Sequence, residues 1–419
     1  MKRYPTRRQA LKTAIAATAP LFVRTPLRGD DAPSNRLKVG LIGTGSMCWS
    51  NAQNIRNFGA CDITALCDPI RRNMTRYREA FNVPADRCVS DYRELLAMSD
   101  VDAVIIAAPD HWHVPIAIAA ARAGKHIYCQ KPLSNTIAEG RSLVETIHQT
   151  GVVFQHGTQL RSSTPARLAC ELVRNGYLGH VKEVVIGSPP GLAIGNVPPQ
   201  PVPEDVDWPM WLGPGEPVEY RDIIVGEIPD VGLRGWYFMK RFSRAGWIAG
   251  YGVHDIDLAL WGLGLEHTGP VRIEGRGTFP TEGLFDTVLD YELTFTFADG
   301  RRIIMTDTSR NEHGVRFMHE NGRDWVFCRS RIDASDRELL RVKFKDSDER
   351  LYVSRVHEAN FADCVRRGDQ RTIAPVDVAH RATSICLLGA ICLELGRPLQ
   401  WDPDNERFVD DDEANALLS

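Results

Sequence analysis

Residues 37–45 read Leu-Lys-Val-Gly-Leu-Ile-Gly-Thr-Gly, a short apolar run that ends in the pattern Gly-x-Gly. In a strand–turn–helix unit, Gly43 would permit a tight turn and Gly45 would let the backbone approach a pyrophosphate. The third glycine of the full G-x-G-x-x-G pattern is replaced by Cys48. The pattern is weak by itself, so the surrounding elements must decide the fold.

The chain that follows alternates apolar runs typical of buried strands with helical segments. Strands are predicted at 37–42, 63–67, 103–108, 126–129 and 152–154, and helices at 51–58, 71–81, 116–123 and 137–149. Pro115 suits the start of the third helix and Gly124 its end. This alternation predicts a doubly wound parallel sheet, and hence a Rossmann domain over residues 36–156.

Asp68 ends the second predicted strand, 23 residues after Gly45. A carboxylate at this place is expected to bind the ribose hydroxyls of NAD and to repel the 2′-phosphate of NADP. Arg71 and Arg72, just downstream, could instead accept that phosphate. NAD is therefore the favoured cofactor, with NADP as the alternative.

A different pattern begins after residue 157. Strands are predicted at 181–186, 271–278, 291–297 and 302–306, and helices at 359–366 and 376–395. Ala298-Asp-Gly300 and Asn321-Gly322 are hairpin signals. Short connections between strands predict a mostly antiparallel open sheet in an α+β domain over 157–419, with the C-terminal helices packing back against the body.

The long Pro- and Gly-rich segment 188–217 shows no periodicity, and such loops are often functional. Four aromatic residues in and after it could form a wall that stacks on a sugar, or could be core or subunit interface. They are Trp208, Trp211, Trp236 and Tyr237.

Composition excludes several classes of function. The 419 residues carry a net charge of -4, which offers no basic field for nucleic acid, and no apolar run is long enough to predict a membrane span. The ten cysteines show no CxxC pair and are expected to be free thiols in the core. His111 and His113 lack a third ligand nearby, so no metal site is predicted.

Residues 1–35 have a basic start and a modest apolar stretch at 13–23, which is typical of an export signal. Thr6-Arg-Arg-x-x-Leu-Lys12 further resembles a twin-arginine signal, which would direct the protein to the periplasm. The alternative is a disordered basic arm on a cytoplasmic protein.

Two further motifs carry a family resemblance. Pro109-Asp-His-Trp-His113 follows the third long strand and Gln130-Lys-Pro132 follows the fourth. Together with the Gly-x-Gly turn they resemble the glucose–fructose oxidoreductase / inositol dehydrogenase / MocA (Gfo/Idh/MocA) family, in its exported bacterial type. That family has Glu-Lys-Pro here, with the lysine beside the nicotinamide and the substrate hydroxyl. Gln130 replaces the glutamate, so Lys131 should lose its proton more readily than beside a carboxylate.

The resemblance continues to the C-terminus, through segments at 157–161, 207–214, 250–261, 396–403 and 412–415. His254 matches the family's active-site helix. Many members carry Asp four residues earlier, where this chain has Gly250; Asp255 or Asp257 could take the place of that carboxylate.

The resemblance implies an NAD(P)-dependent oxidoreductase that moves hydride between a bound nicotinamide and a sugar, cyclitol or sugar derivative. Its catalytic residues would be Lys131 and His254. Its cofactor contacts would be Gly43, Thr44, Gly45, Ser46, Met47, Asp68, Arg72, Pro109, His113, Gln130, Lys131 and Gln159. Its substrate contacts would be Arg161, Trp236, Tyr251, His254 and Asp255.

Two alternatives stay open: a glycosidase that oxidises and re-reduces its substrate with bound NAD, and a non-catalytic nucleotide-binding protein. Because little free NAD exists outside the inner membrane, an exported enzyme would keep its cofactor tightly bound. Association into a homo-oligomer through the sheet of the second domain is also expected.

Overall fold

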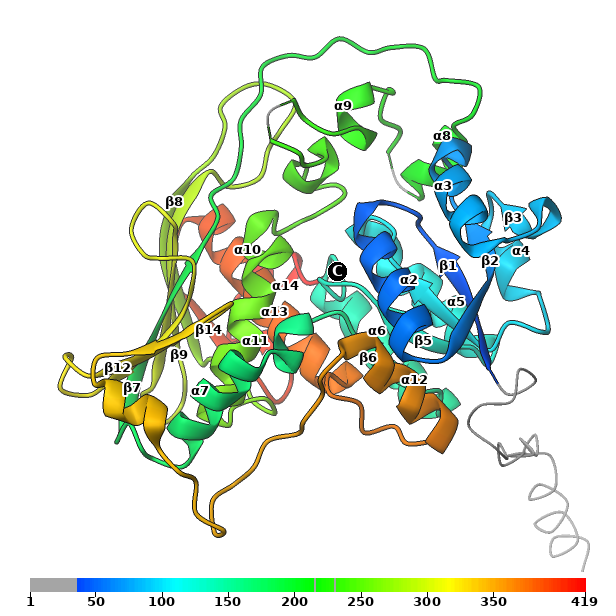
Figure 1. Cartoon of the computed structure of the whole chain (residues 1–419). Coiled ribbons are helices and arrows are strands. Elements are labelled where there is room, and N and C mark those ends of the chain that lie inside the picture. Colours follow the sequence, from blue (N-terminus) through cyan, green and yellow to red (C-terminus); the bar gives the residue numbers. More distant parts are fainter. Residues whose placement is uncertain (1–35, 215, 230) are drawn as a thin grey trace, which may run out of the picture. The chain divides into compact units, whose positions relative to one another are not determined.

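A computed structural model describes residues 36–214, 216–229 and 231–419. The predicted export signal at 1–35 lies outside them. Residues Leu37 to Ser419 form one compact unit, which contains two β-sheets (Figure 1).

The first sheet is a parallel Rossmann sheet, as the alternating pattern predicted. Its strand order is β3-β2-β1-β4-β5-β6, so successive crossovers lead outward in both directions from β1. Ligands of such sheets bind at the carboxyl ends of the strands, where the order reverses. The strands are β1 (Leu37–Ile42), β2 (Cys61–Cys67), β3 (Cys88–Val89), β4 (Ala103–Ile106), β5 (His126–Cys129) and β6 (Phe154–His156).

Two helices of this sheet, α3 (Arg71–Phe81) and α6 (Ile137–Thr150), begin at the predicted residues, whereas α2 begins at Ser46, before the predicted start at residue 51. Thr136 and Glu139 form a capping box at the start of α6, and Gly124 follows α5 with a positive φ of 73°. Pro115 was predicted to start α5 but lies inside it, because the helix already begins at Asp110 and tolerates one missing amide hydrogen. The helices are α2 (Ser46–Phe58), α3 (Arg71–Phe81), α4 (Tyr92–Leu96), α5 (Asp110–Arg122) and α6 (Ile137–Thr150), with a short 3-10 turn η3 (Ala85–Arg87).

The second sheet is mostly antiparallel, which confirms the prediction for this part of the chain. Its order is β13-β12-β11-β7-β10-β9-β8-β14-β15, and β7–β10 is its parallel pair. Gly300, with φ of 83°, turns β9 into β10, and Asn321-Gly322 lies between β11 and β12. The strands are β7 (Val181–Ser188), β8 (Arg272–Thr278), β9 (Asp290–Thr296), β10 (Arg302–Asp307), β11 (Gly314–His319), β12 (Trp325–Cys328), β13 (Ile332–Ala334), β14 (Leu399–Asp402) and β15 (Arg407–Phe408).

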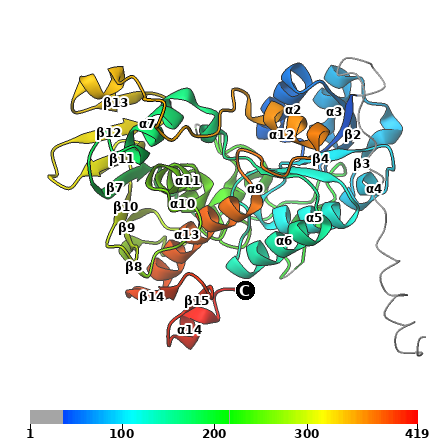
Figure 2. The same cartoon turned by 90° about the horizontal axis from the view of Figure 1, so that it is seen from below.

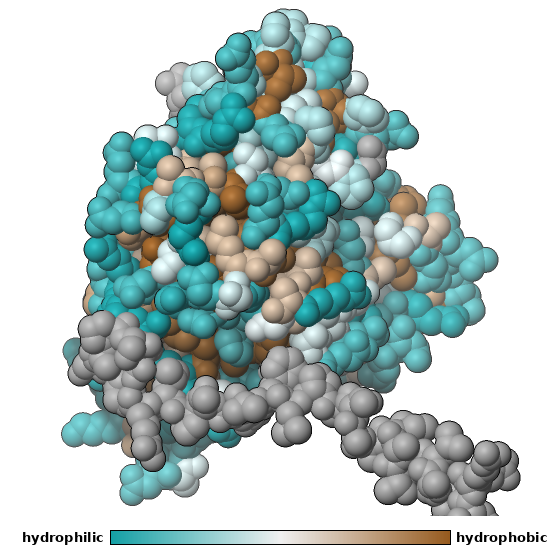
Figure 3. Space-filling view, turned by 90° about the vertical axis from the view of Figure 1, so that its right-hand side faces the viewer, coloured by the Kyte–Doolittle hydropathy of each residue, from teal (hydrophilic) through white to brown (hydrophobic). Residues whose placement is uncertain are grey.

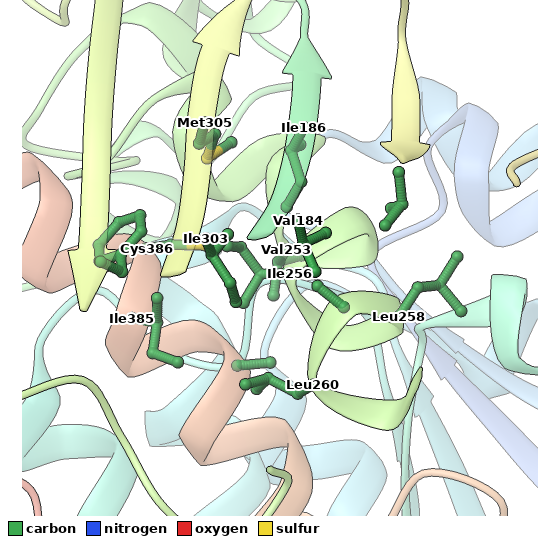
Figure 4. Packing of buried hydrophobic residues seen from close by; sticks show 14 of the residues in the cluster. Val184, Ile186, Val253, Ile256, Leu258, Leu260, Ile303, Met305, Ile385 and Cys386 are labelled. Atoms are coloured by element: carbon green, nitrogen blue, oxygen red, sulfur yellow. The ribbon is translucent and has the colours of Figure 1, made fainter. Parts of the chain in front are cut away.

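The largest core cluster lies between this sheet and two buried helices, α11 (Gly252–Leu263) and α13 (Val376–Leu395). Figure 4 shows their side chains meeting those of β7 and β10. The residues labelled there are Val184, Ile186, Val253, Ile256, Leu258, Leu260, Ile303, Met305, Ile385 and Cys386. This packing fixes α11, and therefore His254, against the sheet.

Helices from the end of the chain return to the Rossmann helices, as expected. Helix α12 (His357–Arg367) contacts α2, and α13 contacts α6; Figure 2 shows both pairs side by side. The remaining short elements are η4 (Gln159–Ser162), α7 (Thr164–Arg174), η6 (Arg337–Arg341) and α14 (Asp412–Asn415).

Apolar residues lie mainly inside this unit. Within the described residues, α13 is the one helix long and apolar enough to cross a membrane, but 83% of its apolar window is buried against the rest of the chain. On the face seen in Figure 3, hydrophilic residues cover most of the surface and apolar residues show in small areas. Helix α13 thus packs as a core helix.

Residues 189–246, named here the bridging segment, run from β7 back to the Rossmann sheet (Figure 1). The amide of Asp207 donates to the carbonyl of Pro69 at 2.8 Å, and the amide of Arg71 donates to the carbonyl of Asp205 at 2.9 Å. The segment contains α8 (Trp208–Leu212), α9 (Asp222–Val225) and η5 (Gly235–Phe238), and α10 (Trp247–Gly250) follows it. It therefore covers the carboxyl edge of the first sheet.

Candidate active site

The turn after β1 has the shape that its glycines predicted. Gly43 has φ of 83°, and a Cβ there would lie 2.6 Å from the carbonyl of Ala107. Helix α2 begins at Ser46 without a side-chain cap at Gly45 and without an acid in its first turn. Its first amide hydrogens are therefore left for a ligand. Cys48 is fully buried in α2, so a small thiol serves where a third glycine is usual.

Asp68 ties this turn to the end of β2. Its carboxylate accepts hydrogen bonds from the amide of Thr44 at 2.8 Å, from the hydroxyl of Thr44 at 2.9 Å and from the amide of Ile70 at 2.8 Å. Burial raises the pKa of Asp68, and these donors oppose that rise. Thr44, which is predicted as a cofactor contact, makes two of these hydrogen bonds to Asp68.

A cavity of about 550 Å³ opens beside the turn. Asp68 lines it with Gly43 and Gly45, and the flat side chains of Tyr92 and Trp112 belong to the same lining. Apolar walls with a few polar groups are typical of a cavity that takes an aromatic base.

Arg72, which is predicted as a cofactor contact, lies outside this lining. Its guanidinium is paired with Asp205 of the bridging segment at 2.7 Å. Arg71 donates to the carbonyl of Glu204 at 2.5 Å. Both side chains are engaged by a segment more than a hundred residues away, which local sequence does not indicate.

A second cavity, of about 970 Å³ and open to solvent, adjoins the first. The two linings share Gly45, Ala107, Ala108, Pro109 and Arg234. Ten predicted site residues line the second cavity, and they come from both halves of the chain. They are Gly45, Ser46, Met47, Pro109, His113, Gln130, Lys131, Trp236, Tyr251 and His254.

Lys131 is buried, and its ammonium donates to the carbonyl of Gly250 at 2.6 Å. Burial lowers the pKa of Lys131, and the charge of Arg329 lowers it further, while Asp110 raises it. A Cβ at Gly250 would lie 2.5 Å from the ring of Trp247. The aspartate that many family members carry here has no room.

The side chain of Gln130 belongs to a chain of hydrogen bonds, and as a neutral amide it adds no negative charge beside the ammonium of Lys131. Its amide donates to Asn51 at 2.8 Å, and Asn51 donates to Glu358 of α12 at 2.6 Å. The carboxyl that acts on Lys131 is Asp110, which accepts from Ser243 at 2.6 Å. Burial raises the pKa of Asp110 to about 7. The sequence analysis missed Asp110, although it lies within the quoted Pro-Asp-His-Trp-His motif.

His254 lies on α11 and is 9% exposed. Its Nδ1 is buried and has no hydrogen-bond partner among the described residues. Burial, reinforced by the charge of Lys131, lowers the pKa of His254 well below its usual value. A neutral imidazole in the lining of a cavity can accept a proton from a substrate.

Three further predicted site residues, besides Thr44 and Arg72, lie outside both linings. Gln159 donates to the hydroxyl of Tyr128 at 3.1 Å, and Asp255 is fully buried in an ion pair with Arg329. Arg161 is held by Asp257 through contacts of 2.7 and 2.8 Å. Asp257 is thereby also unavailable as a substitute for the missing carboxylate. Arg161 and Asp255 are therefore engaged in ion pairs within the fold, and Gln159 is engaged in a hydrogen bond.

The predicted aromatic wall divides into two parts. Trp236 and Tyr237 line the second cavity and stack at 3.7 Å, with Trp247 stacked on Tyr237 at 5.1 Å. Trp208 is instead buried in the bridging segment, and Trp211 lines the first cavity. The sequence analysis missed Trp247, whose proximity to Gly250 was its only local signal.

The two histidines of the motif have different surroundings. Both ring nitrogens of His113 face carbonyl oxygens, those of Pro132 at 2.6 Å and Ala108 at 2.9 Å, and burial lowers its pKa to about 4. His111 packs against Trp211, away from the second cavity, and burial lowers its pKa to about 3. In the described parts of the chain, no three His, Cys, Asp or Glu side chains group as metal ligands.

The Rossmann sheet, its glycine turn and an adjoining cavity lined by residues from both parts of the chain define a two-domain Rossmann-type oxidoreductase. Family models match both parts: an oxidoreductase family with an NAD-binding Rossmann fold over residues 37–158, and the C-terminal alpha/beta domain of an oxidoreductase family over 164–419. The chain belongs to the Gfo/Idh/MocA oxidoreductase family.

Three curated relatives span two kinds of activity. The uncharacterized oxidoreductase YrbE of Bacillus subtilis is 25% identical over 67% of this chain and 70% of its own length. Myo-inositol 2-dehydrogenase of Thermotoga maritima is 28% identical over 40% of this chain and 48% of its own. An alpha-N-acetylgalactosaminidase of Tannerella forsythia is 30% identical over 35% of this chain and 33% of its own. The chain thus spans less than half of the last two.

Among solved structures, the fold is similar to that of aldose-aldose oxidoreductase from Caulobacter crescentus, solved with glycerol. The TM-score is 0.63 at 17% identity, over 87% of this chain and 99% of that one. At this identity the likeness shows the fold alone.

Proposed function

We propose that the protein transfers hydride between NAD and a hydroxyl-bearing carbon of a sugar, cyclitol or sugar derivative. The observation that carries this proposal is that Lys131 and His254 line one cavity beside the start of α2. Bound nicotinamide supplies the hydride acceptor, and a nearby base must take the hydroxyl proton. Both residues suit that task, because burial lowers the pKa of each and so favours the neutral form that can accept a proton.

The residues beside β1 fit a dinucleotide. Gly43 permits the turn, the first amides of α2 lack a side-chain cap, and Asp68 borders the cavity suited to a base. Amide hydrogens at a helix start favour a pyrophosphate. Engagement of Arg72 by Asp205 removes one partner for a 2′-phosphate, which supports NAD over NADP.

The walls of the second cavity support a sugar-sized substrate. Trp236, Tyr237 and Tyr251 offer flat faces to the C–H groups of a ring, and Glu227 offers a carboxyl at the exposed side. Polar and aromatic groups together suit a polyhydroxy compound better than a charged or a wholly apolar one.

A second candidate is a glycosidase, to which bound NAD would supply a transient oxidation of a ring hydroxyl with no net redox change. Gly250 favours it over an ordinary dehydrogenase, because the usual carboxylate is absent and cannot fit beside Trp247. Glu227 lines the same cavity and could protonate a leaving group. Retention of Lys131 and His254 speaks against a non-catalytic protein.

Product analysis after incubation with free sugars, cyclitols and aryl glycosides separates these activities. A keto product with stoichiometric NADH supports the dehydrogenase. A released aglycone without net NADH supports the glycosidase. If neither product forms with any compound, and NAD does not bind, both proposals are wrong.

Export through a twin-arginine signal remains a proposal, because residues 1–35 lie outside the described part of the chain. A second proposal follows from export: the exported enzyme would retain its nucleotide and regenerate it in place. The purified protein should then carry NAD(H) through gel filtration and release it on denaturation. A nucleotide-free preparation that turns over only with added NAD would contradict retention.

Self-association through the second sheet is likewise proposed. The strands carry oppositely charged pairs such as Arg276–Glu292 at 2.8 Å, which could be shared with a second copy. Light scattering of the parent and of an Arg276→Glu variant measures this; identical monomeric masses would contradict it.

A further inference from the structure

One cation in the linings of the two cavities has no use in the proposed hydride transfer. Arg234 belongs to the bridging segment, far along the chain from the glycine turn, yet it lines both cavities where they meet. Its guanidinium lies over the turn: a Cβ built at Gly45 would be 2.8 Å from Nη1 of Arg234. No other lysine or arginine of the described chain lines the first cavity.

The side chain of Arg234 also has no partner among the residues that the structure describes. It is half-buried, and no carboxylate or carbonyl of the described residues accepts a hydrogen bond or forms an ion pair with it. Two other arginines in or in contact with the bridging segment are paired, Arg72 with Asp205 and Arg221 with Glu219. A half-buried guanidinium without an acceptor is costly unless a ligand supplies one.

The backbone holds this side chain in place. Arg234 pairs with Glu227 in an isolated antiparallel bridge, and its carbonyl accepts from Tyr237 at the start of η5. The next residues, Trp236 and Tyr237, line the second cavity. Arg234 is therefore anchored at the point where the bridging segment passes from one cavity to the other.

We propose that Arg234 binds the pyrophosphate of the dinucleotide from the side opposite to α2 and so slows release of the cofactor. This rests on the proposed binding of NAD. The start of α2 supplies amide hydrogens but no side-chain charge, whereas the pyrophosphate carries two negative charges. Only a guanidinium on the facing side supplies a full charge and paired donors. The flexible stem of Arg234 lets the guanidinium withdraw from Gly45 as the pyrophosphate enters.

The bridging segment would then be held on both sides of the bound cofactor. Its α8 end is bound to β2 and α3 by backbone hydrogen bonds, and its Arg234 end would be bound to the pyrophosphate itself. Release of the nucleotide would then require the Arg234 contact to break first.

The test compares the parent with Arg234→Met, which keeps the length of the side chain and removes its charge. Calorimetry on dialysed protein measures the Kd of NAD, ADP-ribose and adenosine, of which adenosine lacks the pyrophosphate. We expect Arg234→Met to weaken NAD and ADP-ribose roughly ten- to a hundredfold, the range for a hydrogen bond to a charged group. Adenosine should bind both proteins equally.

Two further variants serve as controls. Arg234→Lys keeps the charge but not the paired donors and should recover part of the loss. Lys240→Met removes one positive charge from the same segment, where Lys240 faces Glu394 at 3.9 Å and lines neither cavity, and should bind like the parent. The difference between parent and Arg234→Met should shrink as salt is added.

A second readout is the rate at which purified protein loses bound nucleotide on dilution, which should rise in Arg234→Met by a similar factor. Equal Kd values and release rates in parent and variant would overturn the role of Arg234 and leave nucleotide binding intact. An equal loss for adenosine would also overturn it, because Arg234 would then only shape the pocket. A parent that binds neither NAD nor ADP-ribose would overturn both proposals together.

Discussion

The ammonium of Lys131 lies 2.6 Å from the carbonyl oxygen of Gly250 and donates a hydrogen bond to it. The contact joins the end of β5 to the end of α10. The partner of the lysine is thus a neutral carbonyl group, at a position where the family often has a carboxylate. A neutral acceptor favours the ammonium less than a carboxylate does, so burial prevails and the pKa of Lys131 is lowered. The contact depends on Gly250, because the ring of Trp247 fills the space of any side chain there.

Replacing Gly250 with alanine should therefore disturb both stability and turnover. A Cβ 2.5 Å from the ring of Trp247 forces the ring or the backbone to move, which typically costs about 1–3 kcal/mol. The displaced carbonyl would release Lys131 and lower kcat. Gly195→Ala is the matched control, because nothing lies within 4 Å of its Cβ position. Denaturant unfolding and turnover assays measure both effects; a Gly250→Ala variant like the parent would show that the site tolerates a side chain here.

Lys131→Ala and His254→Ala should each lower turnover by roughly a hundredfold or more, the usual scale for general acid–base groups. The affinity for NAD should change little, because neither side chain lines the first cavity. Steady-state kinetics and calorimetry measure the two effects separately. Near-normal turnover in both variants would place the chemistry elsewhere.

Asp110→Asn should move the pH profile of kcat/KM. The Asp110 carboxylate favours the ammonium of Lys131 and so raises its pKa. Without that charge, Lys131 becomes neutral at lower pH, so the rising limb of the profile should shift toward acid. Glu394→Gln removes an exposed carboxylate that lines neither cavity and should leave the limb in place. An unchanged profile in Asp110→Asn would mean that Lys131 is not the base whose titration sets this limb.

Buried histidines should make the fold sensitive to acid. Burial lowers the pKa values of His113 and His357 to about 4, against about 6.5 in an unfolded chain. Between these values the unfolded chain binds protons that the folded chain does not, so the free energy of unfolding should fall as pH drops from 6.5 toward 4. Each residue would contribute up to roughly 3 kcal/mol.

Urea unfolding across this range measures the slope. His357→Gln should be less stable than the parent at pH 7 but should lose less stability on acidification. Equal slopes in parent and His357→Gln would remove His357 as a cause.

Asp68→Ala should narrow the preference for NAD over NADP, because its carboxylate borders the cavity that suits the adenosine end. The structure adds a cost in stability of about 1–3 kcal/mol, since the buried amide of Thr44 loses its acceptor. Thr44→Val removes only the hydroxyl contact and should keep the preference. Calorimetry showing equal or tighter binding of NADP by the parent would contradict the assignment of NAD.

Local patterns predicted the elements that depend on local physics. The bounds of β5, α3 and α13 agree with the prediction to the residue, because apolar periodicity and terminal glycines act within a few residues. The start of α5 was missed, since Pro115 resembles a first-turn proline while the true start at Asp110 lacks a strong capping signal.

The candidate site was predicted only where a motif sits at a strand end or helix start. Lys131 and His254 were predicted from such motifs, and both line the second cavity. Arg161 and Asp255 were predicted with the same reasoning. Arg161 instead forms an ion pair with Asp257, and Asp255 forms one with Arg329. Nothing in the local sequence distinguishes a charged side chain that faces a cavity from one that faces a distant partner.

By itself, the sequence determined the parallel sheet, the mostly antiparallel sheet after it and the positions of Gly43 and Lys131 within them, because strand and helix periodicity are properties of adjacent residues. Only the tertiary structure decided that Arg234 lies over Gly45, that Trp247 excludes a side chain at Gly250 and that Asp110 is the acid acting on Lys131. Each of these relationships joins segments far apart in the chain. These relationships depend on burial and on interactions between charges that water does not screen, and both arise only after the segments have packed together.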